Sequence, residues 1–387
     1  MDFELTPEQL EVLALVQAVN KRFDLNYWRD KDKNHAFPQE FWSAVGVAGL
    51  TGTIVPEAYG GAGLGLHEAA LVIDELASGG SGVTGGLSFI LGPIFGGFCI
   101  ARHGTPAQKE RYLTALAVDR LKVSLGLSEP DSGSDALAMT TRARRSGDGW
   151  VIRGRKMWTT GANMADLIIV AARTGEPEQR NQDGITVFLV DAPNPHIVLD
   201  PVDKVGLHTI PSFSMALEDV AVPAAAVLGE VGQGWSVLVD ILNPERVAVT
   251  ATATGTGRLL LDLAVQYASE RMAFGRLIGS NQALQFPLAQ WKAYLENAKL
   301  MNLHAAWRFD RGLPCNAESL YAKLLGTRAA CGVADQAMQT MGGFGYTTDY
   351  HVERYWRDLR LFRAAPVSEE MTLAQIAHNV LHMPRSF

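Results

Sequence analysis

The chain has 387 residues, of which 47% are apolar and 19% are charged, and its formal net charge is -7. This length permits a large core of two or three packed layers, and the balance is that of an ordinary globular protein. The negative charge argues against a nucleic acid or an anionic membrane surface as partner. Three separated cysteines without a CxxC motif predict neither disulfides nor a metal site, and indicate a reducing, cytoplasmic compartment.

The first third predicts helices joined by loops, and its acidic, polar start is not typical of a signal or transit peptide. Thr6 before Pro7 and Thr105 before Pro106 are typical helix starts. Residues 76–101 carry no charge over a length that could cross a membrane. Because they contain eight glycines and a proline, we expect a buried core segment and no membrane span.

The middle third predicts strands. Four short runs rich in β-branched residues are separated by Gly, Asn, Asp and Pro. Phe213, Met215 and Leu217 alternate with Ser214 and Ala216, as in a half-buried strand. These runs predict a mostly antiparallel β domain.

After residue 232 the helical period returns and holds nearly to the end, with Gly342 and Gly343 as a helix C-cap. The expected fold class is α+β. We expect a helical domain over 1–119, a β domain over 120–232 and a second helical domain over 233–387.

Three stretches have the composition of ligand-binding segments. LGLSEPDSGSD (125–135) offers hydroxyls and backbone N–H groups to an anion or a polar ring edge, or is only a turn. KMWTTGA (156–162) places Trp158 and Thr160 two residues apart on a strand. Such a pair could bind a flat aromatic ligand, or Trp158 could simply fill part of the core. In ERMAFGRLIGSNQALQF (270–286), Arg271 and Phe274 could clamp a diphosphate and an adenine, or lie on the surface and in the core. The chain has no GxGxxG, GxxxxGK[ST], HExxH or GxSxG motif.

Taken in this order, LSEPDSGSD, KMWTT, ERMAFGRLI, QTMGGFGY and RYWRDLR resemble the signatures of the acyl-CoA dehydrogenase family along nearly the whole chain. The resemblance implies a central antiparallel β-barrel or sandwich, a C-terminal four-helix bundle and a FAD site without a Rossmann turn. It implies a homotetramer or dimer, with an electron-transfer flavoprotein as the acceptor. No metal is implied.

The resemblance also assigns residues to this site. Ser128 would bind the pyrimidine side of the flavin, and Trp158 would cover the ring with Thr160 near N5. Residues reaching the FAD of a neighbouring subunit would be Arg271, Phe274, Gln282 and the run from Gln339 to Gly343, with Gln339, Gly342 and Gly343 as its main contacts. Further cofactor contacts fall on Leu125, Ser134, Ser368 and Glu370, and substrate contacts on Ser134, Asn243 and Arg246.

The family's reaction needs a carboxylate that removes the α-proton of an acyl-CoA thioester while the β-hydrogen leaves as hydride to the flavin. Most members carry this glutamate after an Arg-Asp pair, but here the ungapped count places Pro366 there. Proline is no base and has no N–H for the thioester oxygen. The isovaleryl- and long-chain-type members carry the base earlier, in a run similar to LNPERVAVTA.

Glu245 occupies that earlier position, so we expect it to be the base. Two alternatives stay open: Asn243 and Pro244 are also typical of a helix start that Glu245 merely supports, and a shifted loop could bring in Glu369 or Glu370. The tail is also similar to that of the crotonobetainyl-CoA reductase type. The resemblance therefore leaves enoyl-CoA reduction, oxidase or oxygenase chemistry, and a silent partner subunit as alternatives to dehydrogenation.

Overall fold

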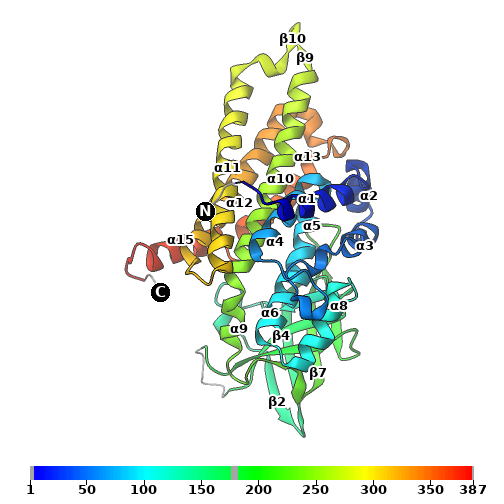
Figure 1. Ribbon diagram of the computed structural model, residues 1–387, viewed down its shortest axis with the longest axis vertical. Helices are drawn as coiled ribbons and strands as arrows, with labels where there is room; N and C mark the ends of the chain where they lie inside the picture. The colour runs from blue at the N-terminus through cyan, green and yellow to red at the C-terminus, as the bar shows by residue number, and fades with distance from the viewer. Residues whose placement is uncertain (1–3, 176–181, 386–387) are drawn as a thin grey trace.

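The computed structural model describes residues 4–175 and 182–385, and its elements run in the order helices, strands, helices (Figure 1). Both predicted capped helix starts are confirmed, since Thr6 and Thr105 each form a capping box with the glutamine three residues later. The N-terminal helices are α1 (Pro7–Asn20), α2 (Leu25–Lys33), α3 (Gln39–Val47), α4 (Leu66–Leu76), α5 (Gly82–Phe89), α6 (Cys99–His103), α7 (Pro106–Gln108) and α8 (Thr114–Ala117).

Residues 66–103 form a nearly continuous helical run in which α4, α5 and α6 alternate with the wider π-helical stretches Ala77–Ser81 and Ile90–Phe98. By length and composition alone this run could cross a membrane. Since 83% of its most apolar window is buried inside the molecule, the prediction of a buried core segment is confirmed. A core helix passes the same test of length and composition.

The middle of the chain forms an eight-stranded sheet in the order β6-β7-β3-β2-β4-β5-β8, with β1 added beside β4. Most neighbours are antiparallel, as predicted, but β1 and β2 pair with β4 in parallel. Phe213, Met215 and Leu217 are buried, which confirms the predicted alternation. The strands are β1 (Val123–Gly126), β2 (Arg142–Ser146), β3 (Gly149–Thr160), β4 (Leu167–Arg173), β5 (Ile185–Asp191), β6 (Ile197–Val202), β7 (Ser212–Pro223) and β8 (Val227–Leu228).

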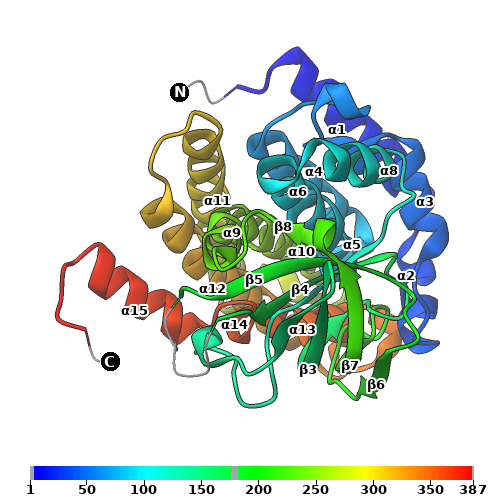
Figure 2. The same ribbon diagram turned by 90° about the horizontal axis from the view of Figure 1, so that it is seen from below.

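The C-terminal part is dominated by three long helices, α10 (Leu242–Glu270), α11 (Gln282–Asp310) and α12 (Asn316–Met341). Helix α10 lies between α4 and α5 on one side and α11 and α12 on the other (Figure 2). The hairpin β9–β10 (Met272–Ala273 and Arg276–Leu277) caps the end farthest from the sheet, and α15 projects from the body in both views. The shorter helices are α9 (Gly234–Asp240), α13 (Val352–Leu359), α14 (Leu361–Ala364) and α15 (Glu369–Asn379).

Candidate active site

Glu245 lies in the first turn of α10 and is 5% exposed. Within the described part of the chain its carboxylate has neither a hydrogen bond nor a salt bridge. Burial raises its pKa to about 7, and the positive charges of Arg246 and Lys323 only partly oppose this shift. The structure therefore contains a buried carboxylate whose two protonation states have similar free energies near neutral pH.

Asn243 is not the N-cap of α10, which the alternative of a simple helix start would require. Helix α10 begins at Leu242 directly after α9, and Ile241 occupies the capping position without a side-chain hydrogen bond. The side-chain oxygen of Asn243 instead accepts hydrogen bonds from Arg246 (3.0 Å) and Ser319 (2.8 Å). Local capping therefore does not explain the polar residues of this segment.

Arg246 is 2% exposed and binds neutral amide oxygens rather than a carboxylate. Its guanidinium donates to Asn243, to Asn316 of α12 (2.9 Å) and to Gln375 of α15 (2.7 Å). Burial lowers the pKa of Arg246, and Glu245 opposes this effect. The guanidinium thus joins the start of α10 to α12 and α15.

The C-terminal segment does not offer a free buried carboxylate. Glu369 accepts hydrogen bonds from Arg363 (2.7 Å) and Arg328 (2.6 Å), and these bonds outweigh burial and lower its pKa to about 2. Glu370 is exposed. Ser368 caps α15 by accepting from the backbone N–H of Met371, and Pro366 is exposed.

The 125–135 turn is built around a buried ion pair that the sequence analysis missed. Lys156 of β3 donates to Glu129 (2.9 Å) and to the carbonyl of Leu127 (3.0 Å). Glu129 also accepts from Thr140 and Thr141. Burial would raise the pKa of Glu129, but these partners lower it to about 2. Glu129 lies in the first quoted motif and Lys156 in the second, and these opposite charges were the sequence signal that could have predicted the pair.

This pair holds the predicted flavin-side residues together. The carbonyl of Ser128 accepts from the N–H of Met157, so the turn lies directly against the strand that carries Trp158. Leu125 and Ser128 are half-buried, whereas Ser134 is exposed.

Trp158 does not lie on a regular strand. A β-bulge between Lys156 and Thr159 puts one extra residue into β3, and Trp158 adopts φ 61° there with its side chain 55% exposed. A bulky residue at positive φ is strained, and such strain is concentrated at functional sites. The hydroxyl of Thr160 lies 2.9 Å from that of Ser212 on β7. The bulge, which strand alternation could not predict, leaves the indole of Trp158 exposed.

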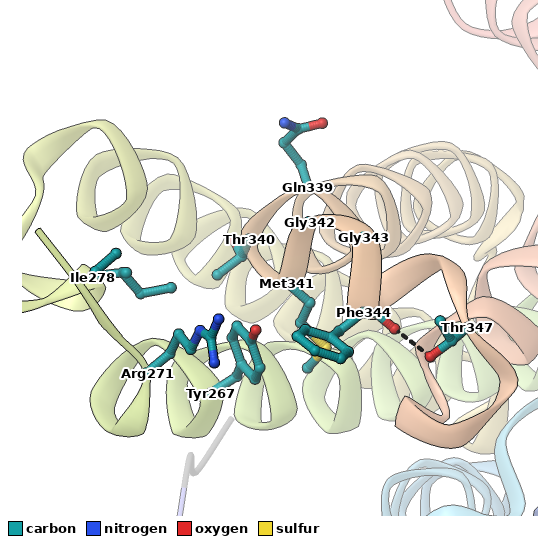
Figure 3. A pocket seen from close by; sticks show the side chains of 11 residues that line it. Tyr267, Arg271, Ile278, Gln339, Thr340, Met341, Gly342, Gly343, Phe344 and Thr347 are labelled. Carbon is teal, nitrogen blue, oxygen red and sulfur yellow. Dashed lines mark hydrogen bonds between the residues drawn. The ribbon is translucent and has the colours of Figure 1, made fainter.

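A second group of predicted residues lines a cavity of about 530 Å³ at the end of α10 and α12. Arg271 lies 5.6 Å from the centre of the Phe344 ring, and Gly342 and Gly343 follow α12 (Figure 3). Gln339 also lines the cavity, but its side chain points away from Arg271. The predicted run from Gln339 to Gly343 lines the cavity throughout, whereas sequence analysis missed the lining residues Tyr267, Ala273, Ile278, Phe344 and Thr347.

Two predicted residues lie outside this cavity. Phe274 is fully exposed at the tip of the β9–β10 hairpin, and Gln282 is exposed at the start of α11. None of the lining residues comes from the eight-stranded sheet that carries Trp158, so the cavity and Trp158 are separate within one chain.

The residues present fit a flavin dinucleotide. A side chain at Gly342 or Gly343 would point into open space, so the glycine backbone is accessible to a polar ligand. Arg271 provides a cation for a diphosphate beside aromatic surface. Trp158 provides an exposed indole for a flat ring.

Family models match nearly the whole chain. They are the N-terminal, middle and C-terminal domains of acyl-CoA dehydrogenase, over residues 6–119, 124–220 and 232–381. Acyl-CoA dehydrogenase FadE12 of Mycobacterium tuberculosis is 36% identical over 93% of this chain and 92% of its own. The human mitochondrial short-chain specific enzyme is 36% identical over 92% and 85%. The 3-(aryl)acrylate reductase of Clostridium sporogenes is 35% identical over 90% and 92%.

Solved structures are also similar to this chain over nearly its whole length. The glutaryl-CoA dehydrogenase complex with glutaryl-CoA has a TM-score of 0.95 at 29% identity and covers 100% of this chain and 98% of its own. Butyryl-CoA dehydrogenase of Megasphaera elsdenii has a TM-score of 0.94 at 29% identity, covering 98% and 100%. A FAD complex of PigA has a TM-score of 0.92 at 25% identity, covering 98% and 99%.

Proposed function

Because this chain belongs to the acyl-CoA dehydrogenase family and its cofactor is FAD, we propose that it dehydrogenates an acyl-CoA thioester with Glu245 as the base. Glu245 removes the α-proton. FAD, when bound, supplies the acceptor for the hydride that leaves the β-carbon. The observation that carries the proposal is a buried carboxylate with no partner within the described residues, while Glu369 is already held by two arginines.

The environment of Glu245 suits proton abstraction. Its pKa of about 7 leaves a substantial ionised fraction at neutral pH, and burial makes that carboxylate more basic than one in water. A buried acid ordinarily remains neutral, and the charge of Arg246, the largest opposing influence, helps to keep the ionised form accessible.

Replacement of Glu245 tests the assignment. In Glu245→Gln we expect FAD to stay bound and the rate of substrate-driven flavin bleaching to fall by about 10²–10⁴-fold, because the amide cannot accept the proton. Anaerobic stopped-flow absorbance with a panel of acyl-CoA thioesters measures this rate. The matched control is Glu296→Gln, which removes an exposed carboxylate of α11 outside the proposed site and should bleach like the unmodified protein. Bleaching that survives in Glu245→Gln but is lost in Glu370→Gln would reverse the assignment.

The cofactor contacts are part of the same proposal. Trp158 covers the flavin, with Thr160, Ser128 and Leu125 at its edge. Arg271, Gly342 and Gly343 receive the FAD of a neighbouring subunit in a homotetramer or dimer, which agrees with a cavity that has no lining residue from the eight-stranded sheet. The remaining predicted contacts with the substrate are Ser134, Asn243 and Arg246. Those with FAD are Phe274, Gln282, Gln339, Ser368 and Glu370. The proposed electron acceptor is an electron-transfer flavoprotein.

A second candidate is reduction of an enoyl-CoA thioester on the same site. Pro366 has no N–H to offer, and one relative is named a 3-(aryl)acrylate reductase. Mixing the reduced protein with enoyl-CoA separates the two directions. Flavin reoxidation faster than bleaching by the saturated thioester would favour the reductase.

A further inference from the structure

Lys323 of α12 is a second buried ionisable group in this region, and the mechanism above gives it no chemical step. It is 2% exposed, and lysine is rarely buried to this extent unless its ammonium is bound by a partner. Nζ donates to the backbone carbonyl of Val367 and, at 3.5 Å, to that of Phe362. Both carbonyls belong to the segment that contains Pro366, so the ammonium fixes the path of this segment against α12.

The charge of Lys323 is not neutralised by a direct partner. Its two acceptors are neutral carbonyls, and no salt bridge to it is found in the described ranges. An ammonium has three N–H groups, so one remains beyond these two bonds. Burial lowers the pKa of Lys323 to about 8, and Glu245 is the largest opposing influence. The reciprocal effect of Lys323 on Glu245 lowers the pKa of the carboxyl group.

The other charged groups near this pair are already engaged. Arg246, on the same helix as Glu245, donates to three amide oxygens. On α15, Glu369 is held by Arg328 and Arg363, and both Glu369 and the exposed Glu370 raise the pKa of Lys323 less than Glu245 does.

Helices α10 and α12 touch on both sides of this pair, through the Ser319–Asn243 hydrogen bond (2.8 Å) and at Gly326, where an added Cβ would lie 2.7 Å from Thr250. Lys323 therefore lies on the stretch of α12 that faces the turn carrying Glu245, and it is a cation there without a carboxylate of its own.

We propose that Lys323 is a positioning residue for proton abstraction: its ammonium fixes the 362–367 segment, and its charge favours the ionised form of the Glu245 carboxylate. This inference rests on the proposed function, because it needs Glu245 as the base. No net charge is created when the proton moves, since the negative charge passes from Glu245 to the substrate and leaves it with the β-hydride, so that the enoyl product is neutral. Lys323 can therefore stay protonated through the step.

Two substitutions separate the charge from the hydrogen bond. Lys323→Gln keeps a donor for the Val367 carbonyl but has no charge, whereas Lys323→Met loses both. In the unmodified protein the bleaching rate should rise with pH through about 7, following Glu245. In both variants we expect this midpoint to rise by about one pH unit, because one buried positive charge is gone. The rate should therefore be several-fold lower below the midpoint and should recover at high pH.

The control is Lys292→Met on the surface of α11, where the lysine pairs only with Glu296. Its pH profile should match the unmodified protein. An equal loss of rate at every pH in both Lys323 variants would overturn the inference, since that pattern indicates only a structural role. Failure of both variants to fold, with Lys292→Met folded, would overturn it for the same reason. If Glu245→Gln still bleaches, it is the proposed function that fails.

Discussion

Lys156 and Glu129 are fully and almost fully buried, so their ion pair is energetically unlike the surface pairs of this protein. A surface pair such as Lys292–Glu296 is screened by water and contributes less than about 1 kcal/mol. Removing one partner of a buried pair leaves an uncompensated charge in a medium that solvates it poorly, which costs about 3–5 kcal/mol. The turn that carries Ser128 therefore depends on a lysine inside the sheet.

Lys156→Met should lower the free energy of unfolding by about 3–5 kcal/mol, because Glu129 would keep its charge without the ammonium. Urea unfolding followed by circular dichroism measures the loss, and Lys292→Met should change the free energy by less than about 1 kcal/mol. The pKa of Glu129 is lowered from 4.5 to about 2, so the stability it contributes is complete above pH 4.5 and is lost as pH falls toward 2. Similar losses in both variants would contradict this account.

The candidate role of some residues could be predicted from the sequence, whereas that of others depends on contacts that the sequence does not report. Glu245 could be predicted because its place beside an arginine resembles a known motif, although its role awaits the test above. Lys323 carries no local signal, because its partners Phe362 and Val367 are about 40 residues away. Asn243 does not cap α10, because its partner Ser319 lies on another helix and tertiary contacts outweigh the local capping preference.

Small residues in helix α10 allow it to pack closely against neighbouring helices. At Gly255 an added Cβ would lie 2.2 Å from the backbone oxygen of Asp74 on α4, so glycine is what allows the two helices to approach this closely. The segment around it is rich in alanine and threonine and is buried nearly throughout. This contact connects the N-terminal helices to the helix that carries Glu245.

Gly255→Ala sets two effects against each other. Alanine favours a helix by about 1 kcal/mol over glycine, but backbone atoms of α4 must move to admit the methyl group. We expect the steric cost to exceed the gain in helix propensity, so that the free energy of unfolding falls by about 1–3 kcal/mol. Gly133→Ala is the control, because a Cβ there meets nothing within 4 Å. Thermal unfolding compares the two, and a stabilised Gly255→Ala would show that α4 shifts freely.

Elements governed by local chemistry were predicted well. The capping boxes at Thr6 and Thr105 and the alternation of β7 need only neighbouring residues. The parallel pairing of β1 with β4 and the bulge at Trp158 depend on strands distant in sequence, which periodicity does not report. The fold class could thus be read from sequence, while the geometry that exposes Trp158 could not.

At the scale of the whole molecule, apolar side chains remain exposed along the outer part of the C-terminal helices and the β9–β10 hairpin. Isolated exposed apolar residues are ordinary, but a group on adjoining elements next to an open cavity is typical of an interface between proteins. They are Met272, Phe274, Leu277, Phe286, Tyr294, Leu300, Leu325 and Tyr346. This distribution supports the proposal that a second copy of the chain covers this end.

Phe274→Asp tests whether assembly and cofactor retention are linked. The unmodified protein should have a mass in solution that is a multiple of the 41.9 kDa chain, measured by light scattering. A buried aromatic anchor typically contributes about 2 kcal/mol or more, so the charged variant should associate at least about thirty-fold more weakly and lose FAD faster on dilution. Val47→Asp is the control, since Val47 is 89% exposed on α3, away from this surface. A monomeric unmodified protein that keeps its FAD would contradict a shared site, because Arg271 and Gly342 would then have no neighbouring cofactor to bind.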